Sequence, residues 1–451
     1  MFSTEANLSK IKNRRIDAEY YDPVIWQRLM KIAMKTESLS RYIETPFRNP
    51  MCYGFKYINK EGVPFIRIDN LCSPHIDYSN IVYISKEVHD RFASTKLNKH
   101  DILMGVRGNT IGRLGVYLGK DGQANFSPNV IRLRPKNPNF SPFIAFYLAS
   151  NFGQRLISRE TSGTGQPTIT SDLIQKIQVI KIDECNYDYF KSLYEKYFNA
   201  VEETKKYYNQ AQHLLESELG LDKLSFQKPV GYTARFSELE LSRRLDAQHF
   251  QPRFEQLIHH LSGFSSERVR DICTYNRRGL QPFYVEDGPV SVVNSQHLGP
   301  HHIDYDGLEK TSEKAFALCP EGHIRQNDLL IYTTGAYIGR TNVFLSNQPA
   351  LASNHVNILR LNSGIDAAYM ALVFQSTVGQ SQTQKHARGS AQAELYPTDI
   401  DRFIVPMLSP SKQAAIGDLV RDSLVKQQES KRLLDQAKTR VEQLIEEAAA
   451  Q

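Results

Sequence analysis

The sequence predicts an α+β protein in which two similar domains are joined by two long helices. Motifs of the first half recur about 227 residues later in the same order, and repetition at so long a spacing indicates a duplicated domain. Within each half, short alternating apolar runs are separated by Gly, Pro and Asn, as in strands joined by turns. A stretch with helical spacing of apolar residues and no proline then follows each half.

Two short motifs open the halves. Residues 14–23 (RRIDAEYYDP) match residues 243–252 (RRLDAQHFQP), with two arginines, an apolar residue, Asp-Ala, aromatic residues and a final proline. The proline lies where a helix can begin, because the first turn of a helix does not need its missing N–H. Short helices are therefore expected over residues 24–34 and 253–261.

The best-matched block lies in the middle of each half. Residues 101–113 (DILMGVRGNTIGR) align without a gap on residues 328–340 (DLLIYTTGAYIGR). Both copies predict a strand, a glycine-containing turn and a second strand, and the glycines permit positive φ or close backbone approach. Residues 127–134 and 353–360 follow as a matched pair of strands that end in arginine.

A helix and a polar loop come next in each half. Helical spacing of apolar residues predicts helices over residues 142–158 and 366–381. Glycine-rich loops follow them, at residues 163–167 (GTGQP) and 389–393 (GSAQA). Each loop precedes a β-branched run, so the loops occupy equivalent places in the two predicted domains.

The two long helices differ from the rest of the chain. Residues 187–219 contain no Gly or Pro, and residues 411–450 contain only one interior Gly. At 1.5 Å per residue the first would be about 50 Å long. Each carries an apolar stripe too long to be buried on one small domain, so we expect the two helices to form an antiparallel coiled coil.

These observations divide the chain into four segments. We predict a first domain at residues 1–183 and a central long helix at 184–222, followed by a second, similar domain at 223–409 and a C-terminal long helix at 410–451. The 451 residues are enough for two or three domains with sizeable cores.

Composition and charge narrow the class of protein. The chain has a formal net charge of +6 and is 41% hydrophobic, without an apolar run of the ~18 residues that a membrane span needs. It begins without a signal peptide, and its five cysteines are odd in number and far apart, so we expect a cytoplasmic protein without disulfides. Residues 1–183 hold 26 Lys and Arg against 16 Asp and Glu, which favours a polyanionic partner.

No catalytic pattern stands out. The chain lacks a phosphate loop, a GxGxxG turn, HExxH and GxSxG. His301 and His302 lie in a polar turn without partners at metal-ligand spacing. Asp172 and Asp399 are interpreted as helix-capping or turn-forming residues rather than catalytic carboxylates. We therefore predict no catalytic residue, no metal site and no cofactor in this chain.

Polar and basic side chains in the matched loops are the candidates for a binding role. Arginine reads guanine edges, Asn and Gln read adenine, and Ser and Thr contact phosphates. The predicted DNA-binding residues are Arg107, Asn109, Thr110, Arg113, Thr164 and Gln166 in the first half, and Arg277, Arg278, Thr334, Tyr337, Arg340, Arg388, Ser390 and Gln392 in the second.

With these motifs the chain resembles the specificity (S) subunit of type I restriction–modification systems. The resemblance covers nearly the whole length and rests on the duplicated blocks, the Gly-x-Gly-Gln-Pro segment and the long helix after each half. The second copy of that segment departs from the family pattern because Ala393 follows Gln392 where the first copy has Pro167.

The resemblance implies a DNA-recognition subunit without catalysis of its own. Residues 1–183 and 223–409 would each be a target-recognition domain that binds one half of a bipartite, asymmetric site in double-stranded DNA. The long helices at 184–222 and 410–451 would set the gap between the half-sites and dock two methyltransferase subunits. Restriction–translocase subunits would join them, and these partners would use S-adenosylmethionine, ATP and Mg²⁺. Two alternatives remain open: the recognition subunit of a related phage-defence or type IIB system, and an enzyme with its own DNA-recognition domains.

Overall fold

The computed structural model describes residues 22–48, 54–59, 61–119, 122–161, 167–226, 229–389 and 392–450. The chain forms two compact units: unit 1 comprises Met1–Val201 with Gln428–Gln451, and unit 2 comprises Glu202–Gln427. Each unit therefore contains part of both long helices. The predicted domain boundaries at residues 183, 222 and 409 separate the long helices from the domains, which this division into units does not test, so they remain predictions.

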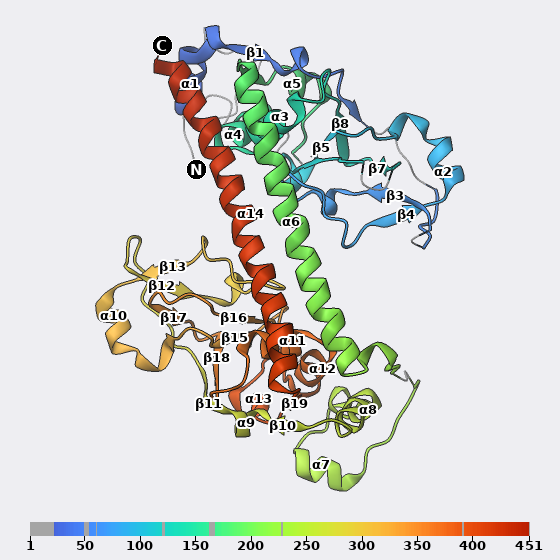
Figure 1. Cartoon of the computed structure of the whole chain (residues 1–451), viewed down its shortest axis with the longest axis vertical. Coiled ribbons are helices and arrows are strands. Elements are labelled where there is room, and N and C mark those ends of the chain that lie inside the picture. The colour runs from blue at the N-terminus through green and yellow to red at the C-terminus, as the bar shows by residue number, and fades with distance from the viewer. Residues whose placement is uncertain are drawn as a thin grey trace. The chain divides into compact units, whose positions relative to one another are not determined.

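Unit 1 alternates short strands and helices before the long helix begins (Figure 1). Its elements are, in chain order, α1 (Pro23–Ile32), β1 (Thr36–Ser38), β2 (Phe47–Arg48), β3 (Val63–Ile66), β4 (Val82–Ile84), α2 (Lys86–Arg91), β5 (Ile102–Gly105), β6 (Leu114–Val116), β7 (Asn125–Phe126), β8 (Val130–Leu133), α3 (Phe140–Ala149), α4 (Asn151–Glu160), α5 (Ser171–Gln175), β9 (Gln178–Ile180) and the first part of α6 (Glu184–Glu218).

Among the described residues, unit 2 follows the same order with three further elements, α7, α9 and β14. Its elements are α7 (Phe236–Ser242), α8 (Pro252–Leu261), β10 (Ser266–Arg268), α9 (Val269–Ile272), β11 (Cys273–Arg278), β12 (Val290–Val293), β13 (Glu309–Thr311), α10 (Glu313–Leu318), β14 (His323–Ile324), β15 (Leu329–Tyr332), β16 (Thr341–Val343), β17 (Ala350–Ala352), β18 (Val356–Leu361), α11 (Ala367–Gln375), α12 (Thr377–His386), α13 (Pro397–Ile400), β19 (Ile404–Pro406) and the first part of α14 (Pro410–Ala450).

The sheets confirm the duplication. Unit 1 has an antiparallel sheet of order β2-β8-β5-β6, a mixed sheet β4-β3-β7 and the pair β1-β9. Unit 2 has the equivalent sheet β11-β18-β15-β16, the mixed sheet β13-β12-β17-β14 and the pair β10-β19. The predicted α+β class with two similar domains is therefore confirmed, and the strands expected in the best-matched block are β5 and β6 in one copy and β15 and β16 in the other.

The same buried ion pair ties the central sheet together in both units. In unit 1 Arg134 donates two hydrogen bonds to Asp101, at 2.8 and 2.7 Å. In unit 2 Arg360 does the same to Asp328, again at 2.8 and 2.7 Å. Both carboxylates are buried, and a planar guanidinium is the side chain that can satisfy both oxygens of one carboxylate. The arginines that end the predicted strands are thus structural residues.

The single helices predicted over residues 142–158 and 366–381 are wrong, because each is two helices. The break lies at Ser150 between α3 and α4, and at Ser376 between α11 and α12, where the backbone is extended. Each serine hydroxyl accepts a hydrogen bond from a backbone N–H in the first turn of the next helix, at 3.1 and 3.2 Å. A serine that caps a new helix in this way competes with the continuation of the old one.

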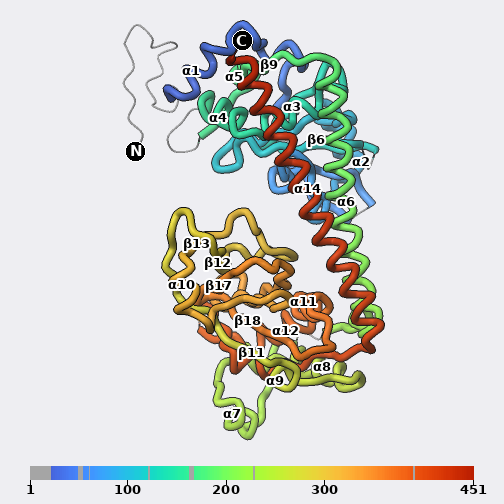
Figure 2. Tube along the Cα trace, turned by 60° about the vertical axis from the view of Figure 1, so that its left-hand side comes forward, coloured from blue at the N-terminus to red at the C-terminus, as the bar shows by residue number. Residues whose placement is uncertain are grey.

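The two long helices are present and slightly longer than predicted. In unit 1 the beginning of α6 packs on the end of α14, and Gln436 donates to the hydroxyl of Tyr189 at 3.1 Å. In unit 2 the end of α6 packs on the beginning of α14, where Ser423 donates to the carbonyl of Thr204 at 2.9 Å and Lys412 pairs with Glu218. The helices therefore run antiparallel within each unit (Figure 1 and Figure 2).

The apolar stripe of the helix pair belongs to the core of each unit. In unit 1, Phe190 and Tyr197 of α6 and Val441 of α14 join the core formed by α3 and the central sheet. In unit 2, Leu215 of α6 and Ile416 of α14 join the core around α11. Each stripe is thus buried in two successive sections, which explains why so long an apolar seam does not need a single large domain.

Candidate nucleic-acid interface

The first candidate site is the turn between β5 and β6. Arg107, Asn109 and Arg113 are exposed on this turn, and the hydroxyl of Thr110 is used locally, donating to the carbonyl of Arg107 at 2.7 Å. The turn is possible because Gly112 has φ +79° and its added Cβ would lie 2.7 Å from the side chain of Gln154. Gln154 in turn donates to the carbonyl of Gly112 at 3.0 Å, which fixes the turn to α4.

The segment after the predicted Gly-Gln-Pro loop lies beside this turn. The N–H of Gly108 donates to the carbonyl of Pro167 at 3.0 Å, and Arg107 and Thr168 form an isolated β-bridge. Thr164 and Gln166 themselves lie outside the described residues. The structure therefore brings together the two regions that the sequence singled out, although they are about 60 residues apart in the chain.

Unit 2 has the same arrangement. The N–H of Gly335 donates to the carbonyl of Ala393 at 2.9 Å, and Thr334 forms an isolated bridge with Glu394. Gln380 donates to the carbonyl of Gly339 at 3.0 Å, as Gln154 does in unit 1. The turn between β15 and β16 is thus fixed to α12 and paired with the second loop in the same way.

The residues of this second turn and loop differ in exposure. Tyr337 and Gln392 are exposed, whereas Thr334 is 6% exposed and its hydroxyl has no hydrogen-bond partner among the described residues. An added Cβ on Gly335 would lie 4.0 Å from the side-chain nitrogen of Gln392, so the loop's glutamine reaches over the turn. Ser390 lies outside the described residues.

The arginines of unit 2 are engaged with neighbouring side chains. Arg388 donates to the buried carboxylate of Asp399 at 2.6 Å. Arg278 lies 4.0 Å from a carboxylate oxygen of Glu394, and both arginines face the ring of Tyr396, at 4.8 Å for Arg278 and 5.7 Å for Arg388. Arg278 also donates to the carbonyl of Leu395 at 2.8 Å, and its Nε is buried without a hydrogen-bond partner among the described residues. Both guanidinium groups are therefore held in place by the second loop and its neighbours.

The other two candidate arginines of unit 2, Arg277 and Arg340, contact different side chains from these. Arg340 stacks over Tyr337, with 3.6 Å between the guanidinium carbon and the ring centroid. Arg277 lies 3.7 Å from Glu321 and does not share the residues that hold Arg278 and Arg388. The structure therefore groups Arg278, Arg388 and Gln392 at one place and leaves Arg277 on the edge of the sheet.

The candidate arginines differ in whether a carboxylate holds them. Within the part of the chain that the structure describes, neither Arg107 nor Arg113 has an ion pair, and neither does Arg340, the counterpart of Arg113 in unit 2. The charges of Arg278 and Arg388 are partly compensated by Glu394 and Asp399. Three residues that hold the second loop were not predicted from the sequence. Glu394 and Tyr396 lie outside the repeated motifs, and Asp399 was interpreted only as a capping residue. Asp399 is such a cap, and it also anchors Arg388.

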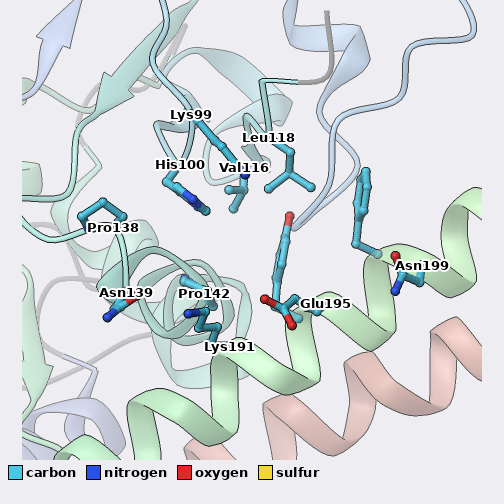
Figure 3. Close-up of a pocket in the computed structure, with 12 residues that line it drawn as sticks. Lys99, His100, Val116, Leu118, Pro138, Asn139, Pro142, Lys191, Glu195 and Asn199 are labelled. Atoms are coloured by element: carbon cyan, nitrogen blue, oxygen red, sulfur yellow. The ribbon is translucent and has the colours of Figure 1, made fainter. Parts of the chain in front are cut away.

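Unit 1 also contains a cavity of about 430 Å³ against α6, lined by both polar and apolar side chains. Figure 3 shows Lys99 and His100 on one side of it, and Lys191, Glu195 and Asn199 of α6 on the other. Burial lowers the pKa of His100, and the nearby ammonium groups of Lys99 and Lys191 lower it further.

The described residues offer no metal site: no group of three or more His, Cys, Asp or Glu among them is arranged to hold an ion. His301 packs against the ring of Tyr208 with centroids 4.0 Å apart, and burial lowers its pKa to about 4. Within the same ranges, no helix is long and apolar enough to cross a membrane.

One curated protein and several solved structures are similar to the chain. The chain is 27% identical over 126 residues to the type I restriction enzyme EcoBI specificity subunit of Escherichia coli, and this match covers 27% of the chain and 26% of that relative. The chain is similar to type I specificity subunits. The resemblance predicted from the motifs is thus confirmed, with a match that spans about a quarter of the relative's length. No family model matches the chain.

Solved structures of type I specificity subunits are also similar to the chain. The S subunit from M. genitalium is 12% identical with a TM-score of 0.49, over 92% of this chain and 95% of that one. The S subunit from Thermoanaerobacter tengcongensis is 14% identical with a TM-score of 0.29, over 92% of this chain and 95% of that one.

Proposed function

We propose that this chain is the non-catalytic DNA sequence-specificity subunit of a type I restriction–modification complex. Each unit reads one half of a bipartite, asymmetric site in double-stranded DNA. Methylation and cleavage belong to partner subunits, two methyltransferases and restriction–translocase subunits, which use S-adenosylmethionine, ATP and Mg²⁺. The complex acts in the cytoplasm, where its DNA substrate is found.

One observation carries this proposal: in each unit the turn after the equivalent strand, β5 or β15, pairs with a segment far along the chain and is held by an equivalent glutamine. The paired segments are Pro167–Thr168 and Ala393–Glu394, and the glutamines are Gln154 and Gln380. In both units a strand–turn–strand segment presents arginine beside Asn, Thr or Gln side chains. Arginine and amide side chains are those that discriminate base edges by bidentate hydrogen bonds. Two such readers that differ in sequence match an asymmetric target with two half-sites.

The antiparallel helix pair supports the rest of the proposal. Each unit buries one section of α6 against one section of α14. A paired helix resists bending, so it suits a spacer that sets the distance between half-sites, and its outward surface suits docking of methyltransferase subunits. The similarity to a type I specificity subunit over 126 residues favours this assembly over an enzyme with its own recognition domains.

Methylome sequencing of a host with and without this gene tests the proposal, because one measurement returns both half-sites and their gap. The twin variants Arg113→Ala and Arg340→Ala should each relax one half-site by about 10- to 100-fold, corresponding to about 1–3 kcal/mol for a bidentate base contact. Arg41→Ala, at an exposed arginine away from the loops, is the matched control and should leave the methylome unchanged.

A gene-dependent methylome without a bipartite motif would contradict the proposal, as would equal loss at both half-sites in each twin variant. Co-purification provides a second readout. The tagged chain should bring down a methyltransferase, and a preparation that methylates or cuts DNA with no partner present would identify an enzyme instead. The genes that flank this one separate a type I complex from a related phage-defence or type IIB system.

A further inference from the structure

Unit 2 has a cavity of about 500 Å³ between α7, α8, α12 and β19, outside the loops described above. Four basic side chains line it, against two acidic ones. The basic residues are Arg268, Arg270, Lys385 and Arg402, and the acidic residues are Glu238 and Glu255. The cavity therefore carries a net positive charge.

Most of these positive charges have no carboxylate partner. Across the described ranges, Lys385, Arg268 and Arg402 form no ion pair, whereas Arg270 lies 3.5 Å from Asp271. Burial lowers the pKa of the Lys385 ammonium, and the more distant Glu255 and Glu238 only partly oppose this shift. A half-buried cation without a partner is costly, and an anion in the cavity would relieve that cost.

The two histidines of the cavity, His249 and His386, have lowered pKa values, as expected from burial beside other positive charges. The pKa of His386 is lowered to about 3, first by burial and then by His249, Lys385 and the nearby arginines Arg402 and Arg244. The ring of His386 lies 5.7 Å from that of His249. At neutral pH both imidazoles are uncharged, so they serve as polar walls while the lysine and arginines supply the charge.

The second copy of the Arg-Arg-apolar-Asp-Ala motif, at residues 243–252, contributes His249 and Phe250 to one wall of this cavity. Arg244 is held by Asp246, with Nε–Oδ2 and Nη2–Oδ1 distances of 2.6 and 2.9 Å, and donates to the carbonyls of His386 and Ala387 at 2.9 and 2.8 Å. His249 Nδ1 lies 2.8 Å from the carbonyl of Lys385. The motif thus satisfies the free carbonyls at the C-terminal end of α12, which places Lys385 at the cavity.

The same two segments connect the cavity to the second candidate loop. Lys385 precedes Arg388 by three residues, and Arg402 follows Asp399, the carboxylate that holds Arg388, by three residues. Three residues span at most ~10 Å, so the cavity lies within about that distance of Arg388. A DNA strand that reaches Arg388 and Gln392 would therefore pass the cavity within about one or two nucleotides.

We propose that this cavity is a binding site for a backbone phosphate of DNA, with Lys385 and Arg402 as the principal ligands and Arg268 at its edge. The proposal rests on the proposed function and extends it with a contact that sets register without reading sequence. Arg244, Asp246 and His249 are positioning residues, because they hold the helix end that carries Lys385.

The test is the salt dependence of DNA binding by the full chain, measured by fluorescence anisotropy on a duplex carrying its methylome-defined site. Lys385→Gln and Arg402→Gln should each weaken binding about tenfold. Each should also reduce the slope of log K against log salt by about one, the effect of losing one phosphate contact. Sequence preference should not change. Arg402 is exposed, so its variant folds and tests the site even where Lys385→Gln does not.

Lys223→Gln is the matched control, because Lys223 is exposed after α6 and forms no ion pair within the described residues. Its slope should equal that of the unmodified chain. If the unmodified chain binds its site with a steep slope and the Arg402 variant keeps that slope, the phosphate site is refuted while the proposed function stands. If the unmodified chain shows no site-specific binding, the proposed function is what fails.

A free anion is the remaining occupant to separate. Inorganic phosphate at millimolar concentration is added to the unmodified chain and to the two variants, and thermal unfolding is followed. A phosphate-dependent rise in Tm that both variants lose, with an unchanged DNA salt slope, would assign the cavity to a free phosphate compound and overturn the DNA contact. The expected result is a slope change in DNA binding together with weak competition by free phosphate.

Discussion

Replacing Arg360 with methionine should destabilise unit 2 and leave unit 1 unchanged. The carboxylate of Asp328 is 0% exposed and accepts three hydrogen bonds: two from Arg360, at 2.8 and 2.7 Å, and one from the N–H of Arg325 at 2.7 Å. Methionine keeps most of the apolar stem and removes the guanidinium. The buried carboxylate then retains a single backbone donor and loses its counter-charge.

The magnitude follows from the geometry of the pair. Breaking a buried ion pair by removing one partner costs about 3–5 kcal/mol. The lower end, about 3 kcal/mol, applies here because the Arg360 side chain is 20% exposed and Asp328 keeps the Arg325 bond. Protonation of Asp328 in the variant limits the loss further. Burial raises the pKa of Asp328, and in the unmodified chain the hydrogen bond from Arg360 opposes that rise. Without Arg360 the carboxylate is protonated more easily, and its buried charge is removed.

Scanning calorimetry of the full chain measures the effect. A domain of this size shifts by about 2–4 °C for each kcal/mol, so the transition of unit 2 should fall by roughly 6–12 °C. Arg134→Met, which breaks the equivalent pair with Asp101 at the same distances, should lower the other transition instead. A shift below about 2 °C, or equal shifts of both transitions in either variant, would refute the duplicated ion-pair account.

Three further predictions follow from the structure. Arg244→Ala should remove the donors to the carbonyls of His386 and Ala387 and relax the second half-site while the first stays intact, which methylome sequencing would show; Arg243→Ala, at the exposed neighbouring arginine, is the control. Acid should weaken unit 2 because the folded pKa of His386 is about 3 against an ordinary 6.5. The unfolded chain then binds the extra proton, so the stability contributed by neutral His386 is present above pH 6.5 and is lost as pH falls towards 3. Urea titrations should show roughly 2 kcal/mol less stability at pH 5 from this residue, and no such loss in a folded His386→Gln variant. Deleting one heptad from α6 and the facing heptad from α14 shortens the pair by about 10 Å, so the gap between half-sites should shorten by about three base pairs; an unchanged gap in an assembled complex would contradict the spacer role.

Much of the fold could be predicted because its signals are local or repeated. The spacing of apolar residues indicated both long helices to within a few residues of the bounds of α6 and α14. The ungapped match of two blocks indicated equivalent strands and turns, which are β5 and β6 in unit 1 and β15 and β16 in unit 2. Glycine at the turn was informative because Gly112 and Gly339 both have positive φ, at +79° and +85°, which few other residues adopt.

The candidate site could be predicted only in part. The sequence named Arg388 as a binding residue, and the structure shows that one side of its guanidinium is occupied by Asp399 at 2.6 Å. The sequence also predicted one helix over residues 142–158, because the apolar spacing continues through Ser150. That spacing does not reveal that Ser150 caps a new helix. In both cases the deciding contact involves a particular partner atom and leaves no trace in periodicity.

The order of elements, the duplication and the absence of cofactor motifs come from the chain alone, since periodicity, glycine and proline act on their near neighbours. Packing decides which charges are paired inside the fold and which stay exposed at its surface. Arg134 and Arg107 are the same residue type in the sequence. In the structure Arg134 donates to buried Asp101 at 2.7 Å, whereas Arg107 is exposed on a turn. A guanidinium reaches a carboxylate only after strands far apart in sequence have paired, so its role is a property of the folded chain.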